Sequence, residues 1–149
     1  MAGFTLVAVL ILLGALTAAA TAAGPWWSVE QQREREAELL RIGALYAGAL
    51  KNYRDASPGS DRRYPASLDE LLLDGRFVGT RRHLRRLYAD PVRPGQPWGL
   101  IRDPQGGIRG VYSASDATPW MRTPVVRPGL RLQAAGRYRD WHFVATEEP

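Results

Sequence analysis

The residues best suited to chemistry in this chain are its two histidines, His83 and His142. His83 stands within a run of arginines, and His142 follows Trp141 in a strand-like segment. Neither is near a Ser or Cys with the surroundings of a nucleophile elbow, and the chain has no H-E-x-x-H or phosphate-loop motif. Acid–base catalysis needs convergent polar groups of matched pKa. The sequence therefore predicts no catalytic site, no cofactor and no enzyme activity.

Four aspartates in or near predicted loops have side chains that could bind calcium: Asp90, Asp103, Asp116 and Asp140. Calcium takes carboxylate and backbone carbonyl oxygens, but these four residues have no diagnostic spacing. Capping and solvated turns are the favoured interpretation, so no metal site is predicted. The chain also lacks cysteine, which leaves it without disulfides or thiolate ligands.

The basic balance of the chain allows an anionic partner without requiring one. The 149 residues carry a formal charge of +5, and Lys51 is the only lysine among 20 basic residues. This bias towards arginine indicates a G+C-rich genome more than selection for phosphate binding. Nucleic acid is therefore not an expected partner. The arginines of 81–86 are interpreted as a solvated face, with docking to an acidic partner surface as the alternative.

The N-terminal segment predicts a membrane anchor. Residues 4–23 carry no charge, and a helix of about 20 residues matches the thickness of the hydrocarbon core. We therefore expect a transmembrane helix over 4–24, in contact with membrane lipid. The alternative is a secretory signal peptide, because Ala20-Thr21-Ala22 is an A-x-A cleavage pattern. Against that alternative, the apolar run exceeds the usual length of about 7–15 residues, and no Lys or Arg precedes it.

The apolar segment passes without a linker into an amphipathic helix. Apolar residues recur at spacings of three and four: Leu39, Ile42, Tyr46, Ala49 or Leu50, and Tyr53. Opposite charges lie three apart at Glu30–Arg33, Arg33–Glu36, Arg35–Glu38 and Glu38–Arg41. We interpret them as a solvated face, with registration between subunits as the alternative. Pro25 should kink the helix and 56–60 should end it, which predicts one bent helix of about 50 residues.

Residues 56–149 are predicted to form a small domain. A capping box at Ser67–Glu70 should begin a short helix that Gly75 ends, with a further turn over 83–88. Residues 98–102 and 108–113 predict a hairpin, 138–145 predict a third strand, and 116–136 predict an irregular loop. The expected fold class is α+β: a long N-terminal helix whose second half packs on a small antiparallel sheet.

These features resemble the type IV pilin-like proteins, and in particular the G-type pseudopilins of the type II secretion system. Gly3-Phe4-Thr5-Leu6 resembles the prepilin peptidase junction, where cleavage follows Gly3 and the new terminus, Phe4, is methylated. Counted from Phe4, Pro25 is the twenty-second mature residue, where pilin helices commonly carry a helix-loosening proline. The segment 64–71 resembles the Tyr-Pro opening of the globular half. Asp90-Pro91 and Trp98-Gly99 resemble the Asp-Pro-Trp-Gly element, here interrupted by six residues.

The resemblance implies a leader remnant at 1–3, a transmembrane helix at 4–24, a periplasmic helix at 25–55 and a pseudopilin domain at 56–149. It implies one pass through the inner membrane with the C-terminal domain in the periplasm. The protein would assemble through its N-terminal helix, including Leu6, Ala8 and Pro25, to support protein secretion across the outer membrane. Implied partners are other pseudopilin subunits, the inner-membrane platform, prepilin peptidase and secreted cargo.

One residue departs from the family pattern. Most pilin-like proteins have Glu at the fifth mature residue, where it neutralises a neighbour's N-terminal amine, whereas this chain has Ala8. A subunit at a filament tip has no neighbour above it, so the resemblance favours a minor, capping or atypical role. The alternative function is a periplasmic binding module with a cleaved signal peptide. A nucleic-acid-binding or uptake pilin is a third hypothesis.

Overall fold

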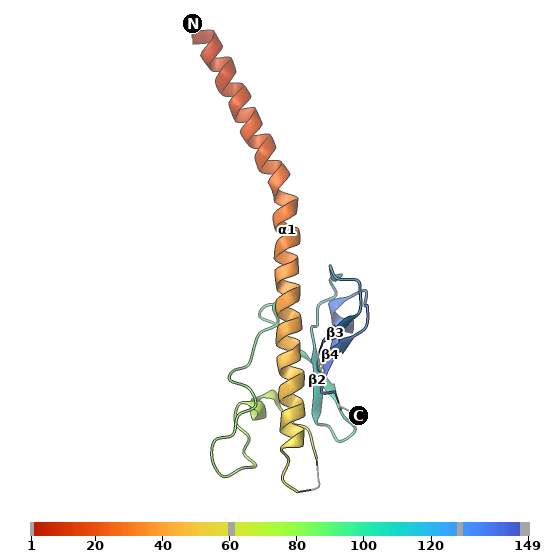
Figure 1. The fold of residues 1–149 in the computed structure, drawn as a ribbon. Coiled ribbons are helices and arrows are strands. Elements are labelled where there is room, and N and C mark those ends of the chain that lie inside the picture. Colours follow the sequence, from red (N-terminus) through yellow and green to blue (C-terminus); the bar gives the residue numbers. More distant parts are fainter. Residues whose placement is uncertain (1, 60–61, 128–129, 147–149) are drawn as a thin grey trace. The chain divides into compact units, whose positions relative to one another are not determined.

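The computed structural model contains a 54-residue helix and two small antiparallel sheets (Figure 1). It describes residues 2–59, 62–127 and 130–146, without the side chains of residues 2, 18–27, 127 and 131. The chain divides into two compact units, Met1–Glu34 and Arg35–Pro149. Helix α1, Ala2–Asp55, contributes residues to both units. The α+β class expected from the sequence is confirmed.

Within the first unit, the described part of α1 exposes its apolar side chains. Nine large ones are between 53 and 83% exposed: Phe4, Leu6, Val7, Val9, Leu10, Ile11, Leu12, Leu13 and Leu16. Among the described residues, no helix has both the length and the apolar character needed to cross a membrane. The span predicted over 4–24 includes side chains outside the described ones, so it stays a prediction. Helix α1 continues through Pro25, as predicted, while the kink expected there stays a prediction.

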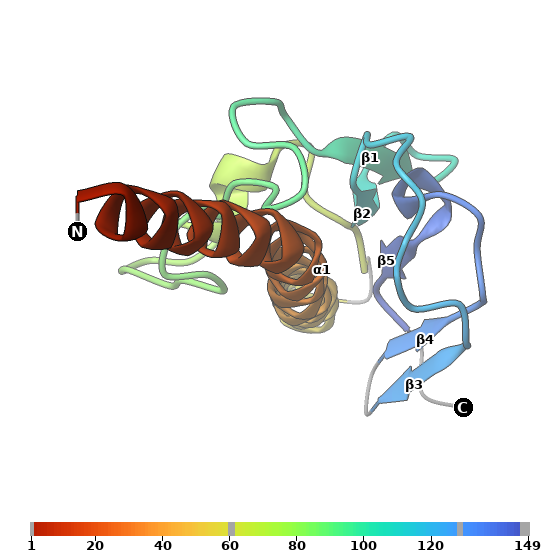
Figure 2. The ribbon, with the colours of Figure 1, turned by 90° about the horizontal axis from the view of Figure 1, so that it is seen from above.

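Within the second unit, α1 forms the centre of the core. The predicted apolar stripe is confirmed, because Leu39, Ile42, Tyr46, Ala49, Leu50 and Tyr53 are all buried. Burying each large side chain contributes about 1.5–3 kcal/mol. The helix ends at Asp55 as predicted, where the chain enters a turn and Gly59 takes a φ of +80°. Figures 1 and 2 place this part of α1 between the sheets and the segment that follows the helix.

The main sheet has three antiparallel strands in the order β1-β2-β5. Strands β1 (Gly99–Arg102) and β2 (Ile108–Tyr112) form the predicted hairpin, with Gly106 at a φ of +88° in the turn. The third strand, β5 (His142–Val144), is shorter than predicted, because Tyr138–Asp140 forms the 3-10 helix η2. Residues pointing from this sheet towards the core include Val111 and Phe143, both fully buried.

A second hairpin occupies part of the segment that was predicted to be an irregular loop. Strands β3 (Val125–Arg127) and β4 (Leu130–Leu132) pair antiparallel, so that prediction was wrong. Val125, Leu130 and Leu132 are buried in the core. Strands of three residues are too short to reveal an alternating pattern in the sequence.

The segment between α1 and β1 contains one short helix, η1 (Leu68–Leu71). The predicted capping box is present, and the Glu70 carboxylate accepts hydrogen bonds from the backbone N–H groups of Ala66 and Ser67. The helical turn predicted over 83–88 was wrong. Instead, the N–H groups of His83 and Leu84 donate to the carbonyl of Leu71 at 2.8 and 2.9 Å. These bonds tie the segment back onto η1.

Candidate functional site

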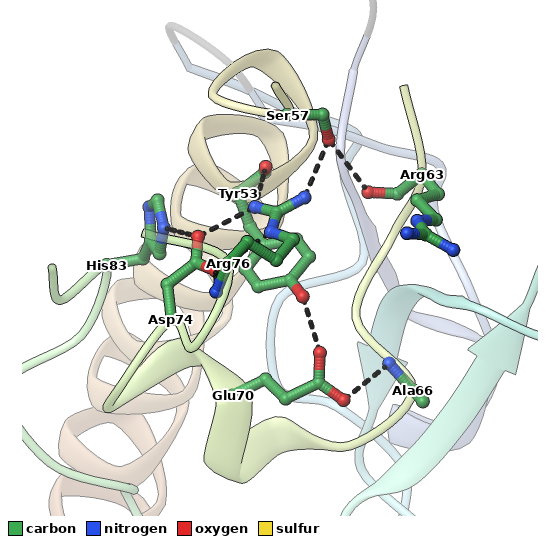
Figure 3. A network of polar contacts seen from close by, with 8 residues as sticks. All are labelled: Tyr53, Ser57, Arg63, Ala66, Glu70, Asp74, Arg76 and His83. Carbon is green, nitrogen blue, oxygen red and sulfur yellow. Dashed lines mark hydrogen bonds and ion pairs between the residues drawn. The ribbon is translucent and has the colours of Figure 1, made fainter. Parts of the chain in front are cut away.

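A network of polar contacts lies at the C-terminal end of α1 (Figure 3). We call it the Asp74 network; it comprises Tyr53, Ser57, Glu70, Asp74, Arg76 and His83. Tyr53 comes from the last turns of α1 and Glu70 from η1, while Asp74, Arg76 and His83 come from the loop after η1. That loop closes on itself, because the N–H of Asp74 donates to the carbonyl of Arg81 at 2.9 Å.

Arg76 and Asp74 form the charged centre of the network. The guanidinium donates two parallel hydrogen bonds to the Asp74 carboxylate, from Nε at 2.8 Å and from Nη2 at 2.7 Å. Such bidentate pairs are the strong form of an ion pair. The Asp74 side chain is fully buried, and the hydrogen bonds from Arg76 hold the pKa of its carboxyl far below the usual range. The network therefore keeps Asp74 charged at any physiological pH.

The same guanidinium also caps the C-terminal end of helix α1. It donates to the Tyr53 carbonyl and to the Ser57 hydroxyl, both at 2.7 Å, and lies 3.6 Å from the centre of the Tyr53 ring. The last carbonyls of a helix lack partners within the helix and carry partial negative charge. Arg76 thus satisfies one of those carbonyls and adds a cation–π contact.

Tyr53 and His83 complete the network. The Tyr53 hydroxyl donates to Glu70 at 2.5 Å, and burial together with this bond raises the pKa of Tyr53. His83 is only 4% exposed at its side chain, and its Nε2 lies 3.0 Å from Asp74. Among the described residues, no buried side-chain nitrogen or oxygen lacks a hydrogen-bond partner. With its groups paired in this way, the network acts as a structural clamp.

A second buried carboxylate, Glu36, corrects one prediction. The charged residues at the start of the amphipathic helix were interpreted as a solvated face, yet Glu36 is only 2% exposed. Its oxygens accept hydrogen bonds from the backbone N–H groups of Trp120 and Met121 and from the Tyr138 hydroxyl, all at 2.9 Å. The neighbouring pairs Glu30–Arg33 and Glu38–Arg41 are formed as predicted. Glu36 instead anchors a distant loop onto the helix.

The four aspartates considered as calcium ligands have separate roles. Asp90 and Asp103 cap turns by accepting backbone hydrogen bonds, Asp90 from Val92 and Asp103 from Gln105 and Gly107. Asp90 also accepts a hydrogen bond from the hydroxyl of Ser113 at 2.5 Å. Asp116 pairs with Arg137 and Arg139 at the surface, and Asp140 is exposed in η2. Within the described part of the chain, no three His, Asp or Glu residues converge as metal ligands would.

The remaining predicted residues are exposed. His142 lies on β5 with its ring centre 5.7 Å from that of Tyr112. Among the arginines of 81–86, Arg81 covers the Phe77 ring and Arg86 covers the Tyr88 ring, which agrees with a solvated face. Gly3, Phe4, Leu6 and Ala8 are exposed on α1, whereas the side chain of Pro25 lies outside the described ones. Of the residues in the basic segment, Arg81 contacts the Asp74 network, because its carbonyl accepts the hydrogen bond from the N–H of Asp74, and His83 belongs to the network.

No protein-family model, no curated protein and no solved structure matches this chain significantly. Sequence reasoning missed the Asp74 network because its members are spread over 31 residues, from Tyr53 to His83, and follow no periodic pattern. The one available signal was an Asp and an Arg two apart in a short loop, Asp74 and Arg76, beside a helix end.

Proposed function

We propose that this protein is a pseudopilin-like subunit of a type II secretion system, or of a related type IV pilus-like filament, in a minor or atypical position. The observation that carries the proposal is the exposed apolar surface of α1. Nine large apolar side chains between Phe4 and Leu16 are more than half exposed. Soluble monomers seldom expose a continuous apolar surface of this kind. Such a surface needs cover from lipid or from the helices of other subunits.

The N-terminal sequence gives the second line of support. The junction Gly3-Phe4-Thr5-Leu6 resembles a prepilin peptidase site, and both Gly3 and Phe4 are exposed, as a peptidase substrate must be. In this role Phe4 becomes the methylated terminus and residues 4–24 cross the inner membrane. The C-terminal unit then lies in the periplasm.

Residues that carry the resemblance in the C-terminal unit hold its core together. Pro65 is buried, and its carbonyl accepts a hydrogen bond from the N–H of Ile108 at 2.7 Å. The Trp98 indole donates to the Tyr88 carbonyl at 2.8 Å, and the buried Asp90 binds Ser113. These contacts fit a well-packed C-terminal unit, Arg35–Pro149, which we call the head. We call the apolar part of α1 in the first unit the stem. The mechanism we propose is packing: the stem assembles with other subunits, and the head offers its surface to neighbours or cargo.

Cysteine cross-linking in cells that carry the complete secretion system tests assembly through the stem. The chain has no cysteine of its own, so Leu13→Cys places a single thiol on the exposed apolar face and Asp69→Cys places one on the exposed surface of the head. With a short thiol-to-amine cross-linker, we expect L13C to form species that contain a second pilin-like subunit. Asp69→Cys serves as the matched control for collisional cross-linking. Equal yields from the two variants, or only the monomer from L13C, would contradict the proposal.

The competing function is a periplasmic binding module released by signal peptidase. In that case, cleavage after the A-x-A pattern at 20–22 would leave a chain that begins near Ala23. The exposed apolar face of α1 would then be absent from the mature protein. In that case L13C would lose its thiol with the signal peptide, and no labelled mature protein would be recovered. The same experiment therefore separates the two functions.

A further inference from the structure

A groove runs over the last turns of α1, the segment 62–64 and the end of β5. Two adjoining hollows of about 460 and 290 Å³ form it. The two hollows lie side by side, because both are lined by Arg54, Arg62, Tyr64 and Ala145. All of the lining residues belong to the C-terminal unit. The groove therefore does not depend on the N-terminal segment or on the function proposed for it.

The groove collects basic side chains from three separate parts of the chain. Lys51 and Arg54 come from α1, Arg62 from the segment after it, and Arg109 from β2. Lys51 is the only lysine in the sequence. Arg54 packs over Tyr64, with its guanidinium carbon 5.4 Å from the ring centre. Four cations around one hollowed surface raise the local concentration of anions.

Two carboxylates bear on the kind of anion that fits. Asp55 lines one hollow and Asp103 lines the other. A nucleic-acid strand carries a phosphate on every residue and would meet both carboxylates. A peptide can carry acidic side chains at chosen positions and leave the others neutral. The two adjoining hollows also exceed the space that a single phosphate or sulfate ion would fill.

We infer that this groove binds an acidic peptide segment of a partner protein. Carboxylates match the planar fork of an arginine, which can donate two parallel hydrogen bonds to one carboxylate. In an extended peptide, alternate side chains point to the same side. Two acidic residues separated by one residue would therefore reach the basic side chains of both hollows. Arg62 and Arg109 are the exposed members of the set, and they are the best positioned to capture the incoming segment.

The test is a fluorescence-anisotropy titration of the full chain, in non-ionic detergent, with a labelled hexapeptide in which Glu alternates with Ser. We expect binding at low salt that weakens as ionic strength rises. The double substitution R62Q/R109Q should weaken binding about tenfold or more, because two charge-assisted contacts are lost. The matched control R85Q/R86Q removes two exposed arginines outside the groove and should change affinity less than about twofold. Equal thermal midpoints for both variants establish that each is folded.

Several outcomes would overturn the inference. An equal loss in R85Q/R86Q would mean that only net charge matters. Full competition by inorganic phosphate would mean a site for a small anion, and tighter groove-dependent binding of a single-stranded oligonucleotide would mean a nucleic-acid site. Glu147 and Glu148 follow Thr146, which lines the groove, so E147Q/E148Q is titrated in parallel. Binding seen only in that variant supports the inference, with the chain's own carboxylates as competitors; binding in neither overturns it.

Discussion

At the scale of single residues, several buried polar groups hold distant parts of the chain together. The Asp74 network engages a buried carboxylate, the more buried of the two histidines and the end of α1 in one set of contacts. Glu36 similarly holds the backbone of a loop more than 80 residues away in the sequence. Buried charges of this kind are stable only when every partner is present. Substitutions at these buried carboxylates should therefore have large effects on stability.

Substituting Asp74 tests this view. Asp74→Asn should lower the free energy of unfolding by about 3 kcal/mol at neutral pH, because it leaves Arg76 partly buried without its counter-charge. The folded-state pKa of Asp74 lies below its unfolded value. The pair therefore contributes its full stability above that unfolded value, and the contribution is lost as pH falls towards the folded pKa. Urea unfolding of the full chain in mild detergent at pH 7, 5 and 3 measures the change.

The control for this experiment is Asp116→Asn. Asp116 also pairs with arginines, and the hydrogen bond from Arg139 lowers its pKa, but the pair lies at the surface. Exposed pairs contribute little to stability, so D116N should unfold almost like the parent. The difference between the parent and D74N should shrink at acid pH. If the unfolding free energies of the parent and D74N changed in parallel with pH, the contribution of Asp74 to stability would not depend on its charge.

At the scale of elements, the sequence predicted those helices and strands that are determined by interactions between residues close in sequence. The predictions of the apolar stripe on α1 and of the β1–β2 hairpin were correct. Helical periodicity and the turn at Gly106 both depend on residues that are close in sequence. The β3–β4 hairpin was missed, since strands of three residues show no alternation. Glu36 was misassigned because its partners, Trp120, Met121 and Tyr138, are set only by tertiary packing. Long-range contacts of this kind leave no mark on a single sequence.

Two glycines in α1 give a matched test of how the helix packs. A Cβ added at Gly43 would overlap the Phe143 ring, whereas one added at Gly48 would meet nothing within 4 Å. Replacing Gly by Ala in an exposed helix stabilises by about 0.8–1 kcal/mol, so Gly48→Ala should raise the free energy of unfolding. Gly43→Ala should instead lower it by about 1–3 kcal/mol, as overpacked cores do. Urea unfolding in mild detergent again gives both values.

The opposite signs are the essential result of that comparison. If both alanine variants were stabilised, β5 would not lie against α1 at Phe143, and the packing of the sheet on the helix would be wrong. If both were destabilised, helix propensity would not govern the exposed side of α1. Either result would require a different arrangement of the C-terminal unit.

At the scale of the whole molecule, the chain combines an exposed apolar helix with a compact head that carries a basic groove. In the proposals made above, lipid or other helices cover the first feature and an acidic segment binds the second. In the proposed function, the apolar stem holds the subunit in the filament, and the head presents its groove to a partner. Under the proposed function, Ala8 stands where the pilin-like proteins usually have Glu, and the loss of that contact between subunits favours the minor or atypical position that we propose.

Intact-mass spectrometry of the mature protein, purified from cells that also produce a prepilin peptidase, tests the central claim most directly. The account predicts a chain that begins at Phe4 and carries one methyl group on its terminal amine. Gly3→Ala, made as the control, should reduce this processing. A mature chain that begins near Ala23, or an unprocessed chain in the presence of active peptidase, would contradict the assignment as a pilin-like subunit.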